Sequence, residues 1–183
     1  MTPLDSRCLD AFPNWLQSLG DDARSLAGLL EPAELGEASR RRVAAALTYL
    51  FKSLDLIPDG LEDLGFIDDA FVLRTAIASA VSDDAELTNK DGSGTLERLV
   101  RDAELVREFL GSDYERLASY VSGLDRGSAR GRSVDEILES TAVCADFVRE
   151  VRQWADGYAA PSFARDARNL VKLKAFLSKK LPG

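Results

Sequence analysis

The feature that most constrains the fold is a short, acidic connection between two strongly apolar segments. The segments read VAAALTYLF and AFVLRTAIASAV, and the connection contains DLIPDGLEDLGFIDD, from Asp55 to Asp69. Pro58 forces an extended or turn conformation on Ile57, so no helix can run through this stretch. Apolar residues recur at a helical period on both sides of it. So short a connection predicts that the two helices pack as an antiparallel or sharply angled hairpin.

The remaining segments also have helical periodicity, and none has the alternation of a β-strand. We therefore expect an all-α fold of eight or nine helices, a compact bundle built around the hairpin. Ser133 and Glu136 have the spacing of a capping box, which marks the start of a long helix. The preceding segment DRGSARGRS is expected to be a flexible loop. The predicted helices are 4–19, 23–30, 34–52, 66–82, 95–110, 114–124, 133–157 and 162–180.

Composition is consistent with one globular domain. A chain of 183 residues with 45% hydrophobic content can bury one core, so we expect a single domain over 1–183. Within it, residues 34–82 form the hairpin core and 95–183 supply additional helices. The protein is acidic, with a formal net charge of -8, and we expect no nucleic-acid binding because phosphates would be repelled.

Several kinds of chemistry are disfavoured by the residues present. The chain has no His, which removes the commonest general base, the Ser-His and Cys-His pairs, and imidazole metal sites. Cys8 and Cys144 stand alone, unlike the paired cysteines of zinc or redox motifs. The first residues, MTPLDSRCLDAF, do not resemble a signal peptide, and no apolar window is long enough to span a membrane. We expect a reduced, cytoplasmic protein, with peripheral membrane contact as the alternative, and a non-enzyme rather than an enzyme.

The connection and its flanks resemble the YkvA-like family, also called domain of unknown function 1232. Tyr49 is followed by the run Asp55-Leu56-Ile57-Pro58-Asp59, and then by Leu64-Gly65 and the pair Asp68-Asp69. The resemblance covers about residues 43–81. Ser53 and Glu62 depart from the pattern, since family members usually carry Pro there. The resemblance implies a small helical bacterial domain, and it implies no reaction because the family has no established activity.

The carboxylates of the connection are the first candidate site. Asp55, Asp59, Asp68 and Asp69 could bind a hard cation such as Mg²⁺ or Ca²⁺ through oxygen ligands. Alternatively, each carboxylate serves the fold locally. Asp59 precedes a turn, while Asp68 and Asp69 lie in the first helical turn, where carboxylates favour the helix dipole. Arg74 follows closely and is expected to pair with a carboxylate inside the hairpin.

The last predicted helix is the second candidate site, because charge is concentrated there. From Ser162 onward the chain carries a net charge of +5, so the remainder carries -13. Such a helix could lie on an anionic membrane or bind an acidic partner. Alternatively, its apolar side packs on the core and its cations offset the acidic body. The cations are Arg165, Arg168, Lys172, Lys174, Lys179 and Lys180.

Together these features predict a non-enzymatic binding or adaptor module for an unknown protein partner. Tyr49 is interpreted as a core aromatic residue. Two alternatives stay open: a metal-binding or metal-dependent protein that uses the four carboxylates, and a peripheral membrane protein.

Overall fold

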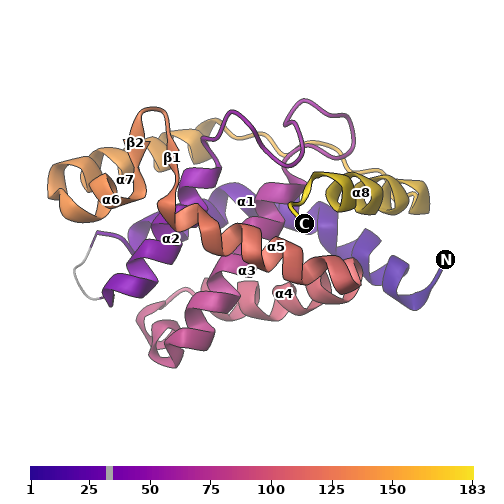
Figure 1. Ribbon diagram of the computed structural model, residues 1–183. Helices are drawn as coiled ribbons and strands as arrows, with labels where there is room; N and C mark the ends of the chain where they lie inside the picture. Colours follow the sequence, from indigo (N-terminus) through magenta and orange to yellow (C-terminus); the bar gives the residue numbers. More distant parts are fainter. Residues whose placement is uncertain (32–34) are drawn as a thin grey trace.

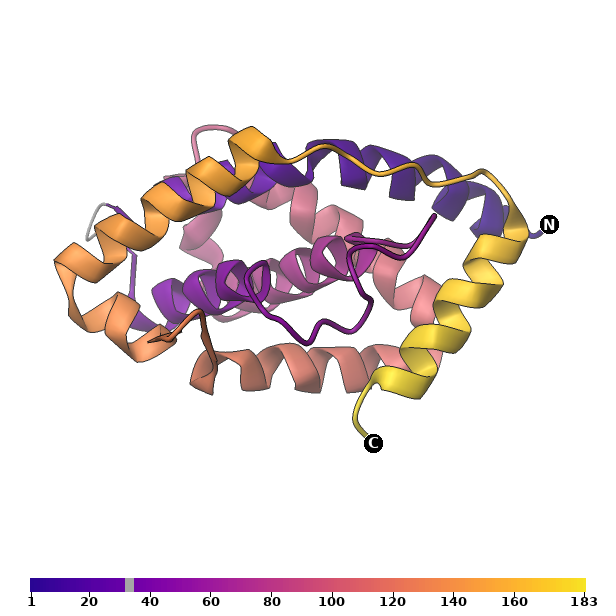
Figure 2. The same ribbon diagram turned by 90° about the horizontal axis from the view of Figure 1, so that it is seen from above.

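The computed structural model describes residues 1–31 and 35–183. Within these ranges the chain forms eight α-helices, three short 3-10 helices and one two-stranded hairpin (Figure 1). The predicted all-α class and the number of helices are confirmed. Viewed from above, α2 and α3 occupy the middle, and α1, α5, α6, α7 and α8 surround them (Figure 2).

Helix α1 (Pro3–Gly28) is one continuous helix, so the predicted division into two helices at Gly20 is wrong. The side chain of Thr2 caps it, in a capping box with Asp5. Gly20 does not end the helix because it packs closely against α7: a Cβ atom there would lie 3.3 Å from the Ala155 carbonyl oxygen. Burial of the apolar face of α1 therefore outweighs the low helix propensity of Pro13 and Gly20.

The central hairpin consists of α2 (Glu37–Tyr49) and α3 (Ile67–Asp83), which pack against each other. The predicted range 34–52 is too long at its end, because residues 50–52 form tighter turns with i→i-3 bonds. Its first residue lies outside the described ranges. Helix α3 is buried along most of its length and also contacts α1, α4 and α5. The connection, which we define as residues 50–66, crosses one face of the molecule (Figure 2).

Helices α4 (Thr95–Leu110) and α5 (Tyr114–Gly123) form the next layer against α3. The short 3-10 helices are Ala85–Lys90, Gly111–Asp113 and Leu124–Arg126. The segment expected to be a flexible loop instead forms the hairpin of β1 (Ser128–Ala129) and β2 (Arg132–Ser133). Its two turn residues, Arg130 and Gly131, both have positive φ, as a tight two-residue hairpin requires.

The predicted helix 133–157 is two helices, α6 (Val134–Glu139) and α7 (Thr141–Gly157). The capping box of Ser133 and Glu136 is confirmed. Ser140, which has an extended backbone, interrupts the helix, and its hydroxyl accepts a bond from the Val143 N–H. The break allows α6 to pack on α2 while α7 packs on α1.

Helix α8 (Ala167–Lys180) begins later than predicted, because Asp166 and not Pro161 defines its start. The Asp166 carboxylate accepts a bond from the Arg168 N–H at 2.9 Å. Residues 158–166 are extended and run beside α1 (Figure 2). Phe163 in this stretch is buried, with its ring centroid 5.9 Å from that of Phe12.

Candidate functional site

A buried hydrogen-bond network fixes the start of the connection. The Tyr49 hydroxyl donates to Asp68 Oδ2 at 2.6 Å and accepts from the Leu56 N–H at 2.8 Å. The Ile57 N–H donates to the same Asp68 oxygen at 3.0 Å. Tyr49 is therefore more than the core aromatic residue that the sequence suggested, since it joins the end of α2 to the connection and to α3. The sequence held one sign of this role, because Tyr49 is the first residue of the family motif that continues at Asp55.

The four predicted carboxylates lie near enough to interact electrostatically. Burial raises the pKa of Asp69 well above its usual value, and the charges of Asp68, Asp59 and Asp55 raise it further. Burial also raises the pKa of Asp55 to about 7 and that of Asp68 to about 6, although Tyr49 and Ile57 partly offset the effect at Asp68. Asp59 is exposed as a residue, and partial desolvation of its carboxyl group also raises its pKa. The structure therefore gathers the residues of the first candidate site into one group of interacting acids.

Some oxygens of this group are buried without a hydrogen-bond donor among the described residues. Asp68 and Asp69 lie in the first turn of α3, as predicted, but neither is its N-cap residue, which is Phe66 and makes no side-chain capping bond. Among the residues that the structure places, no three Asp, Glu or Cys side chains form a group that could hold a metal ion. Cation binding stays a prediction. The oxygens without donors are Asp55 Oδ1, Asp68 Oδ1 and Asp69 Oδ2.

The second half of the connection is held in an unusual backbone conformation. Asp63 and Phe66 have positive φ values of 64° and 62°, a region that residues other than Gly seldom adopt. Gly65 lies so close to the chain that a Cβ atom there would be 2.1 Å from the Asp59 carbonyl oxygen. The Phe66 ring packs against Tyr158, with centroids 5.3 Å apart. The connection is thus a specifically folded segment.

Arg74 lies outside the carboxylate group, in a buried ionic network. Its side chain is 0% exposed, and its Nη2 lies 3.2 Å from Asp102 Oδ2 and 3.7 Å from Asp22 Oδ2. The guanidinium stacks over Trp15 at 4.2 Å from the ring centroid. The expected pairing inside the hairpin is therefore wrong, because both partners belong to other helices, α1 and α4.

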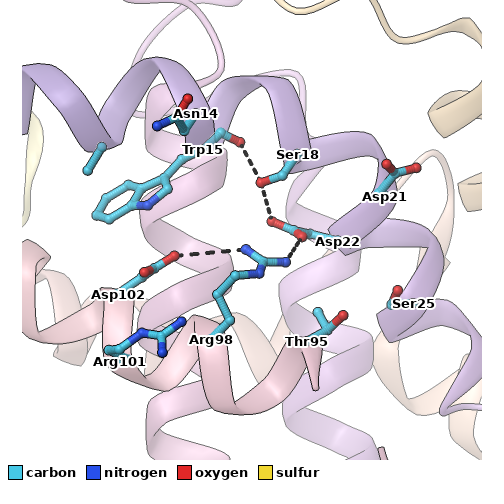
Figure 3. A pocket seen from close by; sticks show the side chains of 11 residues that line it. Asn14, Trp15, Ser18, Asp21, Asp22, Ser25, Thr95, Arg98, Arg101 and Asp102 are labelled. Carbon is cyan, nitrogen blue, oxygen red and sulfur yellow. Dashed lines mark hydrogen bonds and ion pairs between the residues drawn. The ribbon is translucent and has the colours of Figure 1, made fainter. Parts of the chain in front are cut away.

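A cavity of about 500 Å³ opens beside this network, between α1 and α4. Arg98 on its wall also binds Asp22, and Ser18 donates to Asp22 Oδ2 at 3.0 Å (Figure 3). Asp22 and Asp102 thus have cationic partners within the chain. The arrangement joins α1, α3 and α4.

The six cations of the second candidate site differ in their partners. Arg165 pairs with Asp10 at 2.5 Å, and Arg168 pairs with Asp166 at 2.6 Å. The four lysines make no ion pair within residues 1–31 and 35–183. The arginines thus balance acids of the same chain by direct contact, and the charges of Lys172 and Lys174 also act on nearby acids, among them Asp166 and Asp5. The lysines are Lys172, Lys174, Lys179 and Lys180.

One face of α8 is packed and the other is open. Leu170, Leu173 and Leu177 are buried against the body, whereas Val171 is 70% exposed. Between α8 and the connection lies a groove of about 480 Å³, which we call the α8 groove. Its lining is mostly apolar, with two lysines and one acid, and consists of Leu61, Glu62, Leu64, Lys172, Ala175, Phe176 and Lys179.

The cysteines are both free and buried. Burial raises the pKa of the Cys8 thiol to about 12, so this group is a poor nucleophile near neutral pH. In the described part of the chain, no helix combines the length and the apolar character needed to cross a bilayer.

Comparison with known proteins gives one match, which concerns the hairpin. The chain matches no curated protein and no solved structure. The matched segment begins in α2 and ends at Arg74, so it contains Tyr49 and all four carboxylates of the first candidate site. It ends earlier than the range of the resemblance seen in the sequence. Residues 40–74 match the model of the family described as "Protein of unknown function (DUF1232)", which confirms the family resemblance over this segment.

Proposed function

We propose that this protein is a non-enzymatic binding module and that the α8 groove, with the lysines around it, is its docking face. The observation that carries the proposal is the lining of this groove, in which Lys172 and Lys179, without ion pairs in the described chain, lie beside the exposed side chain of Leu61. Exposed apolar surface bordered by charge is typical of interaction sites. A ligand with an anionic group and an apolar body would contact both the lysines and the apolar side chains.

The polar groups of the motif have a structural role in this proposal. Tyr49 and Asp68 accept bonds from backbone N–H groups of the connection, and the connection supplies Leu61 and Leu64 to one wall of the groove. The motif would therefore shape the docking face rather than perform chemistry. Turnover of a substrate that Asp68→Asn abolishes in a folded protein would overturn the non-enzymatic assignment.

An apolar anionic dye tests the docking face directly. Anilinonaphthalene sulfonate should bind the folded protein saturably, and the double variant Lys172→Glu/Lys179→Glu should bind it several-fold more weakly. The double variant should keep the thermal unfolding midpoint of the wild type, because these lysines stabilise no acid of the chain by an ion pair. If they served mainly to offset the acidic body, the midpoint would fall instead.

A matched control separates the site from the overall charge. Arg101→Glu/Arg126→Glu changes the net charge equally, at two exposed arginines that make no ion pair in the described chain, one on α4 and one at the end of the 3-10 helix Leu124–Arg126. Dye binding should be unchanged in this control. Equal loss in both double variants, or no saturable binding by the wild type, would contradict the proposed docking face.

A further inference from the structure

The chemistry of the docking face also indicates which class of ligand it takes. We propose that the α8 groove docks on the surface of a lipid bilayer that contains anionic phospholipids. This inference rests on the proposed function and names the ligand of the same face.

The type of cation favours a diffuse negative surface over a protein carboxylate. Arg presents a planar fork that binds one carboxylate in a defined geometry, whereas Lys is a point charge on a flexible stem. Thirteen arginines make ion pairs within the described chain, and all four cations of α8 without such pairs are lysines. Flexible lysines can reach the phosphates of many lipids without a fixed geometry.

Three exposed apolar residues belong to the two elements that border the α8 groove. In the described chain, the large apolar side chains that are exposed are those of Met1, Leu54, Leu61 and Val171. The last three belong to the connection or to α8, which Figure 2 shows on the same side of the molecule. Leu54 is 86% exposed and Val171 is 70% exposed, so each has surface to bury in a bilayer. Apolar side chains next to lysines are the arrangement by which amphipathic helices lie on membranes.

The acids of the connection limit the strength of binding. Asp59 and Glu62 are exposed and would be repelled by the same lipids that attract the lysines. We therefore expect reversible binding that depends strongly on ionic strength, because exposed charges are screened by salt.

Sedimentation of the full chain with lipid vesicles tests the proposal. The protein should sediment with vesicles of phosphatidylcholine and phosphatidylglycerol at low salt, and much less with phosphatidylcholine alone or at high salt. Lys172→Glu/Lys179→Glu should bind the anionic vesicles more than about tenfold more weakly, since each lysine near an anionic surface contributes to binding. Leu54→Ser/Val171→Ser should also reduce binding, whereas Arg101→Glu/Arg126→Glu should leave it close to the wild-type value.

The outcomes separate this inference from the proposed function. If the wild type binds the dye at the α8 groove but not the anionic vesicles, the lipid assignment is wrong and the docking face stands. If it binds neither, both are wrong. Equal binding to neutral and anionic vesicles, or vesicle binding that neither double variant of the face reduces, would also overturn the lipid assignment.

Discussion

At the scale of single residues, Gly65 explains why the motif requires glycine after Leu64. The requirement comes from the close approach of two backbone segments, since the position allows no side chain beside the Asp59 carbonyl. Because that neighbour is backbone, it cannot move aside without changing the turn that begins at Pro58.

Gly65→Ala should therefore destabilise the fold strongly. A Cβ atom 2.1 Å from a carbonyl oxygen requires a backbone shift, and we expect a loss of about 2 kcal/mol or more in the free energy of unfolding. Urea denaturation measures this loss. Gly60→Ala in the same connection is the control, because its Cβ would meet nothing within 4 Å and should cost less than about 1 kcal/mol. Equal costs at the two positions would contradict the explanation.

The sequence predicted the acidic residues of the site but could not predict how each is used. The pattern of Asp55, Asp59, Asp68 and Asp69 correctly marked the group as unusual. That Asp68 accepts bonds from Tyr49 and Ile57 depends on how the connection folds back on α2, which spacing alone does not fix. The family resemblance marked Tyr49 as part of the motif, but only the structure shows that its hydroxyl bonds to Asp68 and to the Leu56 N–H.

At the scale of elements, the junction of the connection and α3 should make stability depend on pH. The pKa values of Asp55, Asp68 and Asp69 are raised in the folded state, mainly by burial. A carboxyl group whose folded pKa is raised stabilises the fold below its unfolded pKa, near 4, and this contribution is lost as pH rises through the folded pKa.

We therefore expect the free energy of unfolding to fall by on the order of 1–3 kcal/mol between about pH 5 and pH 8. Asp69→Asn removes the most strongly affected acid, so the variant should show a smaller decrease and be more stable than the wild type at the upper end. Thermal unfolding at constant ionic strength measures both proteins. Exposed Asp21→Asn should keep the wild-type dependence, and an unchanged slope in Asp69→Asn would contradict the assignment.

The helices show what periodicity can and cannot predict. Helix α4 has the predicted bounds, because its apolar stripe and the flanking residues Gly94 and Gly111 mark the same two ends. The errors have two causes. Gly20 continues α1 because it packs on α7, a helix distant in sequence, so local propensity gave the opposite answer. Ser140 interrupts a sustained apolar stripe through a local cap, in which its hydroxyl accepts a bond from the Val143 N–H.

At the scale of the whole molecule, Arg74 joins parts of the chain that are far apart in sequence. Its partners Asp22 and Asp102 lie on α1 and α4, on either side of the matched segment 40–74. No pattern in a single sequence pairs these residues, which is why the predicted pairing within the hairpin failed.

Arg74→Met should reduce the free energy of unfolding by about 3–5 kcal/mol, because it leaves buried carboxylates with fewer cationic partners. Chemical denaturation measures the loss. Arg24→Met removes an arginine that is 41% exposed and pairs with Asp21 and Asp156, and it should cost less than about 1 kcal/mol. A cost for Arg74→Met as small as that of the control would show that the network adds little to stability.

The contacts of α1 also have a consequence for how the protein is made. Helix α1 packs against α7 and α8 as well as against the central helices. During translation it leaves the ribosome well before α7, so part of its apolar face stays uncovered until most of the chain has been synthesised. Nascent chains that end before α7 should therefore bind chaperones and resist compaction, and release from them should follow the emergence of α7.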